Sequence, residues 1–393
     1  MISEKVLKNL SRSSWIRAMF EEGEKLRKIY GADNVFDFSI GNPDVEPPLE
    51  VKAALKNIIL EDKSGMHGYM NNAGYPVVRE KVAKHLSVET GVAISYENVV
   101  MSVGASGALN VVFKTLLNPE DEVIVFAPYF VEYGFIVDNY NGKLVIVETD
   151  RDSFLPDPQL LAKCINSKTK AIIINSPNNP TGVVYDEDTL SKLAIVVKEK
   201  EKQYNTSIFI VSDEPYSKIV YDDVKVPSIL QIFKNVIKVD SYSKSLSLPG
   251  ERIGYIVVSP KIDDAAMIVN GLIFCTRTLG FVNAPALFQR VIAESLGAKV
   301  KTDEYKVRRD FLYENLTNIG YSCVKPKGAF YLFPKSLIPD DVEFVKHAIK
   351  YNLLLVPGSG FGAPGYFRIS YCVAFQTIRN SVPAFEKLFN DFR

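Results

Sequence analysis

The stretch SYSKSLSLPGERIG, residues 241–254, places one lysine, Lys244, among small hydroxyl residues and contains an arginine, Arg252. It overlaps the end of the run VIKVDS, whose β-branched residues are typical of a buried strand. A charged side chain there is costly unless it has a partner or takes part in chemistry. A lysine amine can form a Schiff base with an aldehyde, and serine hydroxyls and an arginine can bind phosphate. We therefore interpret this stretch as a lysine nucleophile beside an anion site.

Similar groups follow other apolar runs. Asp213 ends the run SIFIVSD, and a buried carboxylate needs a cation as its partner. Small residues follow the run NVVMSVG and begin a predicted helix, whose backbone N–H groups and dipole favour a phosphate. Phe130 follows EVIVFAP, and Asn179 lies in the turn after TKAIIINSP. Taken singly, each of these residues has a purely structural alternative, such as core packing, a helix cap or a turn.

These groups converge if the chain forms an α/β sheet. Short β-branched runs alternate with stretches of helical periodicity, which predicts a parallel sheet covered by helices on both faces. The strand candidates are residues 98–104, 122–128, 143–149, 169–177, 207–213, 235–241 and 252–260. Ligands bind such sheets at the carboxyl ends of the strands. A pyridine ring bearing an aldehyde, a phenolic oxygen and a phosphate would use all of the groups that lie there.

The sequence changes in character after about residue 286. A long charged helix is expected at residues 302–320, followed by short apolar runs and a final amphipathic stretch. We predict a large α/β domain at residues 47–285, built on a mostly parallel seven-stranded sheet flanked by helices. Residues 1–46, with a helix over roughly 3–30, and residues 286–393 are expected to form a smaller α+β domain.

The composition narrows the class of partner. The 393 residues include 46 basic and 46 acidic side chains, so no net positive charge favours nucleic acid or an acidic membrane surface. The four cysteines are far apart and form no CxxC, which argues against a metal site or a disulfide framework. No apolar run approaches membrane-spanning length, and the N-terminal residues do not resemble a signal peptide. We expect a soluble, cytoplasmic protein that binds small molecules.

An ordered set of motifs gives the chain a family resemblance. SYSKSLSLPGERIG is accompanied, along the chain, by GNPD, Tyr69-x4-Gly74, GASGALN, PYF, SPNNPTG, DEPY, KGAFYLF and FRIS. Together these resemble the pyridoxal-phosphate-dependent aminotransferases of fold type I, class I/II, in the aspartate aminotransferase superfamily. The resemblance extends from residue 41 to residue 370, and it implies pyridoxal 5'-phosphate as the cofactor.

The resemblance also implies roles for individual residues. Lys244 would form the Schiff base, and Asp213 would hold the protonated pyridine nitrogen. Tyr216 and Asn179 would hydrogen-bond the phenolic oxygen, and Phe130 would stack on the ring. The groups expected around the phosphate are Gly104, Ala105, Ser106, Ser241, Ser243, Arg252 and, across a homodimer interface, Tyr69. The residues expected to bind the substrate α-carboxylate are Arg368, Gly41 and Asn179.

The implied reaction is transamination between an L-amino acid and a 2-oxo acid by a ping-pong route. Arg277 precedes Asn283-Ala284-Pro285. In one branch of the family, an arginine at nearly this offset binds the side-chain carboxylate of dicarboxylate substrates. It therefore suggests aspartate or glutamate, with 2-oxoglutarate, although a solvated or interface arginine explains it equally well. Two alternatives stay open: a carbon–sulfur β-lyase on the same fold, and a non-catalytic ligand sensor. The sensor is disfavoured because the chain shows no DNA-binding module and no basic surplus.

Overall fold

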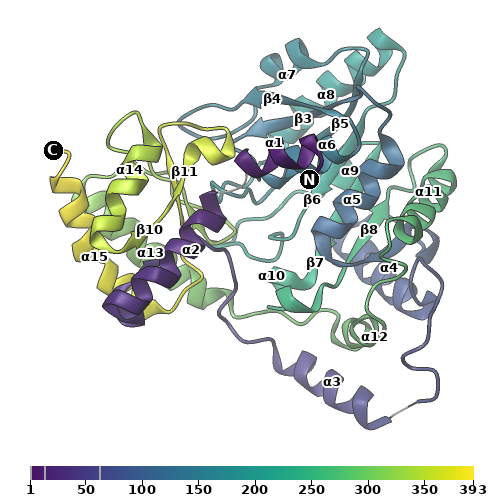
Figure 1. Ribbon diagram of the computed structural model, residues 1–393. Coiled ribbons are helices and arrows are strands. Elements are labelled where there is room, and N and C mark those ends of the chain that lie inside the picture. Colours follow the sequence, from purple (N-terminus) through teal and green to yellow (C-terminus); the bar gives the residue numbers. More distant parts are fainter. Residues whose placement is uncertain (1, 13–14, 62) are drawn as a thin grey trace.

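A seven-stranded sheet forms the centre of the computed structural model, which describes residues 2–12, 15–61 and 63–393 (Figure 1). In spatial order its strands are β2 (Val99–Ser102), β8 (Gly254–Val258), β7 (Val236–Ser241), β6 (Phe209–Asp213), β5 (Thr169–Asn175), β3 (Glu122–Ala127) and β4 (Lys143–Glu148). Only β8 runs antiparallel to its neighbours β2 and β7. The predicted fold class is confirmed, and each of the seven strand candidates contains one of these strands.

Helices cover both faces because the buried strands alternate their side chains between two cores. On β3, Val123 and Val125 pack into one core, whereas Ile124 and Phe126 pack into the other. The first core is covered by α5 (Gly104–Leu116), α6 (Glu132–Asn139) and α11 (Ala265–Thr278). The second is covered by α4 (Pro76–Thr90), α7 (Pro158–Cys164), α8 (Glu187–Tyr204), α9 (Ile229–Ile232) and α12 (Ala286–Ser295). Of these, α5 matters most, because its N-terminus lies at the carboxyl edge of the sheet.

Two elements lie at the margins of this layered body. Helix α3 (Leu49–Glu61) lies at the bottom of Figure 1 and packs along α12, with Val51, Ala54 and Ile58 buried. Helix α1 (Glu4–Arg12) reaches α6, where Asn9 donates a hydrogen bond of 3.1 Å to Asp138. The helix expected over residues 3–30 corresponds to α1 and α2 (Trp15–Tyr30), and residues 13–14 lie outside the described residues. No described helix meets the length and hydropathy needed to cross a bilayer.

A second group of elements lies at the left of Figure 1 and has a core of its own. It contains the sheet β11 (Val356–Pro357), β12 (Phe367–Ser370), β9 (Tyr331–Leu332), and the pair β1 (Phe36–Asp37) and β10 (Leu353–Leu354). Its helices are α2, α13 (Thr302–Ile319), α14 (Asp341–Ala348) and α15 (Phe375–Asn390). Helix α12 nevertheless packs with the large sheet through Val291 and Ile292. The division at residues 46/47 and 285/286 stays a prediction.

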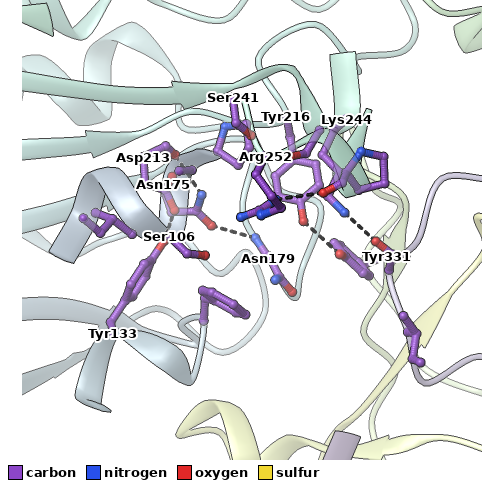
Figure 2. Close-up of a pocket in the computed structure, with 18 of the residues that line it drawn as sticks. Ser106, Tyr133, Asn175, Asn179, Asp213, Tyr216, Ser241, Lys244, Arg252 and Tyr331 are labelled. Carbon is purple, nitrogen blue, oxygen red and sulfur yellow. Dashed lines mark hydrogen bonds between the residues drawn. The ribbon is translucent and has the colours of Figure 1, made fainter. Parts of the chain in front are cut away.

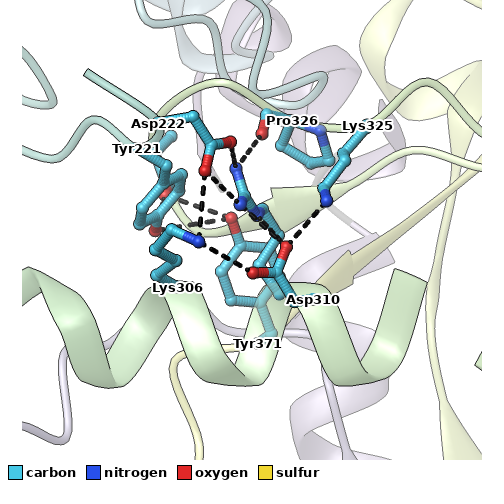
Figure 3. Close-up of polar contacts among 9 residues, drawn as sticks. Tyr221, Asp222, Lys306, Asp310, Lys325, Pro326 and Tyr371 are labelled. Atoms are coloured by element: carbon cyan, nitrogen blue, oxygen red, sulfur yellow. Dashed lines mark hydrogen bonds and ion pairs between the residues drawn. The ribbon is translucent and has the colours of Figure 1, made fainter. Parts of the chain in front are cut away.

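The chain segment that leaves the large sheet after β6 packs against this second group (Figure 3). The chain that leaves β6 places Tyr216, Ile219 and Tyr221 in the second core. Next to them the fully buried Arg309 of α13 donates two hydrogen bonds to Asp222, at 2.6 and 3.1 Å, and its guanidinium lies 4.7 Å from the ring of Tyr221. The residues that follow Asp213 therefore belong to both bodies.

Candidate active site

A cavity of about 270 Å³ opens at the carboxyl ends of β5, β6 and β7, where α5 begins (Figure 2). The predicted residues that line it are Gly41, Ala105, Ser106, Phe130, Asn179, Asp213, Tyr216, Ser241, Ser243, Lys244, Arg252 and Arg368. Residues that are up to 327 positions apart in the chain thus share one wall, as the strand-end argument predicted.

Lys244 lies on the one-turn helix α10 (Tyr242–Ser245), which directly follows β7. Its Nζ donates a hydrogen bond of 2.5 Å to the carbonyl oxygen of Gly41 and lies 5.6 Å from the ring centroid of Phe330. Burial, together with the positive charges of Arg368 and Arg252, lowers the pKa of Lys244 to about 8. An amine with this pKa is partly neutral near pH 7, so it can act as a nucleophile and as a base.

Asp213 ends β6 and is buried beside the cavity. Tyr133 donates a hydrogen bond of 2.6 Å to its Oδ2, but its Oδ1 has no partner. Burial and, to a smaller extent, the negative charges of Asp240 and Glu214 raise the pKa of Asp213, the hydrogen bond from Tyr133 opposes them, and the net pKa is about 7. A buried carboxylate with an open oxygen is suited to a cationic N–H group of a ligand.

The start of α5 and the β7–α10 turn form an anion site. Ser241 and Ser243 are buried and face the cavity together with Ala105 and Ser106. Gly104 is not part of the cavity wall, but a Cβ on it would lie 2.7 Å from Nη2 of Arg252, and its φ is +75°. Glycine at this position therefore lets the guanidinium approach the helix N-terminus, where backbone N–H groups and the dipole favour a phosphate.

Aromatic and amide groups occupy the wall between these sites. Phe130 packs edge to face against Tyr133, with ring centroids 5.5 Å apart. Asn175, at the end of β5, donates a hydrogen bond of 2.8 Å to the carbonyl oxygen of Asp213 and accepts one of 2.8 Å from the backbone N–H of Asn179. Asn175 therefore fixes the ends of two strands relative to each other.

Arg368 on β12 is 2% exposed and forms the far wall. Its guanidinium donates hydrogen bonds to Asn179 Oδ1 at 3.1 Å and to the carbonyl oxygen of Ser39 at 2.5 Å. It lies 4.7 Å from the ring centroid of Tyr331 and 4.8 Å from that of Phe361. No described carboxylate forms an ion pair with it, and its Nε has no partner. A buried guanidinium in this state is suited to a carboxylate ligand.

Sequence reasoning missed one contact across the cavity. Tyr216 and Tyr331 share a hydrogen bond of 2.8 Å, and a Cβ on Gly41 would lie 2.1 Å from the hydroxyl of Tyr331. Tyr331 lies within the motif KGAFYLF, but no role was assigned to it. No role was predicted for Tyr133 or Asn175 either. Asn175 carries the same signal as Asp213, because it is a polar residue that ends an apolar run.

Besides Gly104, two predicted residues lie outside this cavity. Tyr69 is 92% exposed, and its side chain lines no part of the wall. Arg277 lies near the end of α11, is exposed, and has its guanidinium 5.6 Å from the ring centroid of Phe274. The roles expected for both depend on a second subunit.

Comparison with known proteins gives one consistent result. The family model "Aminotransferase class I and II" matches residues 33–385. A probable aspartate aminotransferase of Methanocaldococcus jannaschii is 33% identical over 93% of this chain and 96% of its own length. An aminotransferase structure from Eubacterium rectale covers all of both chains at 42% identity, with a TM-score of 0.96. An aspartate aminotransferase structure from Thermus thermophilus, solved with maleate, covers 99% of both at 29% identity, with a TM-score of 0.87.

This chain belongs to the class I and II aminotransferase family. Members of this family use pyridoxal 5'-phosphate, and the chain is a pyridoxal-phosphate-dependent aminotransferase that acts on amino acids and 2-oxo acids. The comparisons favour transamination over the β-lyase alternative, because the relatives described above are aminotransferases.

Proposed function

We propose that this enzyme transfers the amino group of L-aspartate or L-glutamate to a 2-oxo acid in the cavity around Lys244. One observation carries the proposal. The same cavity contains a buried carboxylate with an open oxygen, Asp213, and a buried guanidinium without a carboxylate partner, Arg368. The first is matched to the ring nitrogen of the cofactor and the second to the carboxylate of an amino acid.

The groups present fit pyridoxal phosphate. When bound, the cofactor supplies an electron sink that makes the α-proton of an amino acid removable. Asp213 Oδ1 would accept a hydrogen bond from the ring nitrogen and keep it protonated. Tyr216 and Asn179 would donate to the phenolic oxygen, and Phe130 would cover one face of the ring. The residues that would hold the phosphate are Gly104, Ala105, Ser106, Ser241, Ser243 and Arg252.

Lys244 would bind the cofactor aldehyde and, once displaced by the substrate amine, move the α-proton. Its pKa of about 8 makes the neutral amine accessible near pH 7 at little cost. Its Nζ already donates to the carbonyl oxygen of Gly41, so the side chain stays oriented toward the cavity. The hydroxyl of Tyr331 contacts this same glycine and would narrow the space around the reacting amine.

Arg368 would hold the α-carboxylate of the substrate in two parallel hydrogen bonds. Its position is fixed by Asn179, Ser39 and two aromatic rings, so substrate binding requires little reordering of the side chain. Support for a dicarboxylate substrate comes from the relatives, two of which are named aspartate aminotransferases, and one of these was solved with maleate. We assign the second carboxylate to Arg277 of the partner subunit.

A homodimer is part of this proposal, and Tyr69 of the partner subunit would reach the cofactor phosphate. In support, Tyr69 is 92% exposed, and α3 presents Leu49 and Leu60 to solvent at 80% and 72%. Exposed apolar side chains of this size on neighbouring segments mark an interaction surface. A cytoplasmic location stays a prediction from the sequence.

The test is a single-turnover absorbance scan of the cofactor-loaded enzyme with a panel of amino acids. We expect the internal Schiff-base band to disappear fastest with aspartate and glutamate, and each 2-oxo acid to restore it. Lys244→Ala is the matched control. It should bind the cofactor but form no imine that borohydride could reduce to a stable covalent bond. Formation of pyruvate and ammonia from cystathionine, without loss of the band in aspartate, would overturn the proposal in favour of elimination.

A further inference from the structure

A buried charge cluster lies on the face of the sheet opposite the cavity. Lys238 of β7 is 3% exposed, and its Nζ donates a hydrogen bond of 2.6 Å to Glu214 Oε2. Asp240 Oδ2 lies 3.7 Å from the same nitrogen. Residues 236, 238 and 240 alternate with residues 237, 239 and 241, so Lys238 and Asp240 face away from Ser241.

Each carboxylate oxygen of this cluster has a partner. Ser212 donates a hydrogen bond of 2.6 Å to Glu214 Oε1, and Tyr255 donates one of 2.8 Å to Asp240 Oδ2. The backbone N–H of Ser241 donates one of 2.7 Å to Asp240 Oδ1. The cluster is therefore ordered, and it binds directly to the backbone of a residue in the proposed phosphate site.

The cluster also adjoins Asp213. Asp213 pairs in register with Val239, which lies between Lys238 and Asp240 on the neighbouring strand. Glu214 follows Asp213 in the chain, and its backbone N–H donates a hydrogen bond of 2.9 Å to the carbonyl oxygen of Val239. Two negative charges thus flank Asp213, and Lys238 offsets them.

We propose that Lys238 is a positioning residue that acts through Asp213. It holds Glu214 and Asp240 at the ends of β6 and β7 and balances their charge, so that Asp213 stays ionised opposite the ring nitrogen of the cofactor. This inference rests on the role proposed above for Asp213. Lys238 itself touches neither cofactor nor substrate, because it lies on the far face of the sheet.

The charges around Lys238 agree with this role. Burial alone would lower the pKa of Lys238, but the charges of Glu214 and Asp240 outweigh burial and raise it, so the side chain stays charged. The pKa of Asp240 is raised to about 6, chiefly by burial. The other titratable groups that face the cluster are Tyr242, Tyr255, Glu89, His85 and Lys218, and Lys218 forms an ion pair with Glu89.

The experiment compares two cofactors that differ at one atom. Pyridoxal phosphate carries the ring nitrogen, whereas its 1-deaza analogue has a C–H group there. Binding of each to the cofactor-free enzyme is measured across pH, and the ratio of the two dissociation constants isolates the contact with Asp213. In the unsubstituted enzyme, we expect the ratio to favour pyridoxal phosphate increasingly as pH rises through the pKa of Asp213, about 7.

Two substitutions should move this ratio in opposite directions. Lys238→Met keeps an unbranched side chain one atom shorter, removes the positive charge, and should shift the pH midpoint upward. Near pH 7 the ratio should fall about fivefold, because one unit charge within about 10 Å is worth on the order of one pKa unit. Glu214→Gln removes a negative charge and should shift the midpoint downward. Lys234→Met, which removes an exposed lysine paired with Asp263 at 2.8 Å, is the control and should leave the ratio unchanged.

The outcomes separate this inference from the role of Asp213. If the unsubstituted enzyme binds both cofactors equally at every pH, the role of Asp213 is wrong. If it discriminates but Lys238→Met and Glu214→Gln weaken both cofactors alike, Lys238 is only structural. Should Lys238→Met fail to fold, Glu214→Gln and the double variant decide. An unchanged midpoint in Glu214→Gln would overturn the inference. So would a double variant, Lys238→Met with Glu214→Gln, whose ratio near pH 7 stayed well below that of the unsubstituted enzyme.

Discussion

Replacing Asp213 with asparagine should change how the stability of the cofactor-free enzyme depends on pH. The pKa of Asp213 in the folded protein is about 7, mainly because of burial. In the unfolded chain an aspartate titrates near 3.9. A carboxyl group whose pKa is raised by folding contributes stability below its unfolded pKa, and this contribution is lost as pH rises through the folded pKa. Wild-type apoenzyme should therefore lose stability between about pH 4 and pH 8.

The size of this effect follows from the two pKa values. A difference of about three pKa units corresponds to about 4 kcal/mol, of which about 3 kcal/mol falls between pH 5 and pH 8. Asparagine has nearly the same shape as aspartate and does not titrate. The free energy of unfolding of Asp213→Asn, minus that of the wild type, should therefore rise by about 3 kcal/mol over this range.

The assay is urea denaturation of both apoenzymes at pH 5 and pH 8, at equal subunit concentration. The titration of Lys244 is common to both proteins, so it cancels in the comparison. Adding pyridoxal phosphate at pH 8 should stabilise the wild type more than Asp213→Asn, because a ring cation partners the aspartate but not the asparagine. A difference between the two proteins that does not change with pH would refute the argument that Asp213 is buried without a cation.

Two further predictions concern substrate binding. Arg368→Gln should lower kcat/KM for aspartate and alanine alike, by about 10- to 100-fold, since a charge-assisted hydrogen bond contributes about 1.5–3 kcal/mol; cofactor affinity, measured by absorbance titration, should stay unchanged. Arg277→Ala should raise KM for aspartate about tenfold and leave alanine turnover unaltered; an unchanged ratio of the two activities would remove Arg277 from the site.

The sheet and much of the cavity could be predicted from the sequence, for a physical reason. Buried strands in a parallel sheet are continuous apolar runs, so their ends are visible, and polar residues at those ends must share one edge. Asp213 and Lys244 were found in this way. The resemblance supplied the remaining roles, including that of Arg368, which comes from a distant part of the chain.

What escaped prediction depends on contacts that no local pattern specifies. The hydrogen bond between Tyr216 and Tyr331 joins residues 115 positions apart in the chain. Lys238 and Asp240 alternate with apolar residues, a pattern that is typical of a strand with one face in solvent. The structure buries both of them, at 3% and 6% exposure, and their mutual neutralisation makes this possible.

The contact of Arg309 with Asp222 attaches the chain segment that follows β6 to the second core. Tyr216 and Tyr331 belong to the second core, whereas Asp213 and Lys244 are attached to the large sheet. The two tyrosines and Arg368 therefore form one wall of the cavity, and the carboxyl edge of the large sheet forms the other. Because Asp213 and Tyr216 are only three residues apart, the short segment between them sets the gap between these two walls. Damage to the second core, even far from the cavity, would alter that gap.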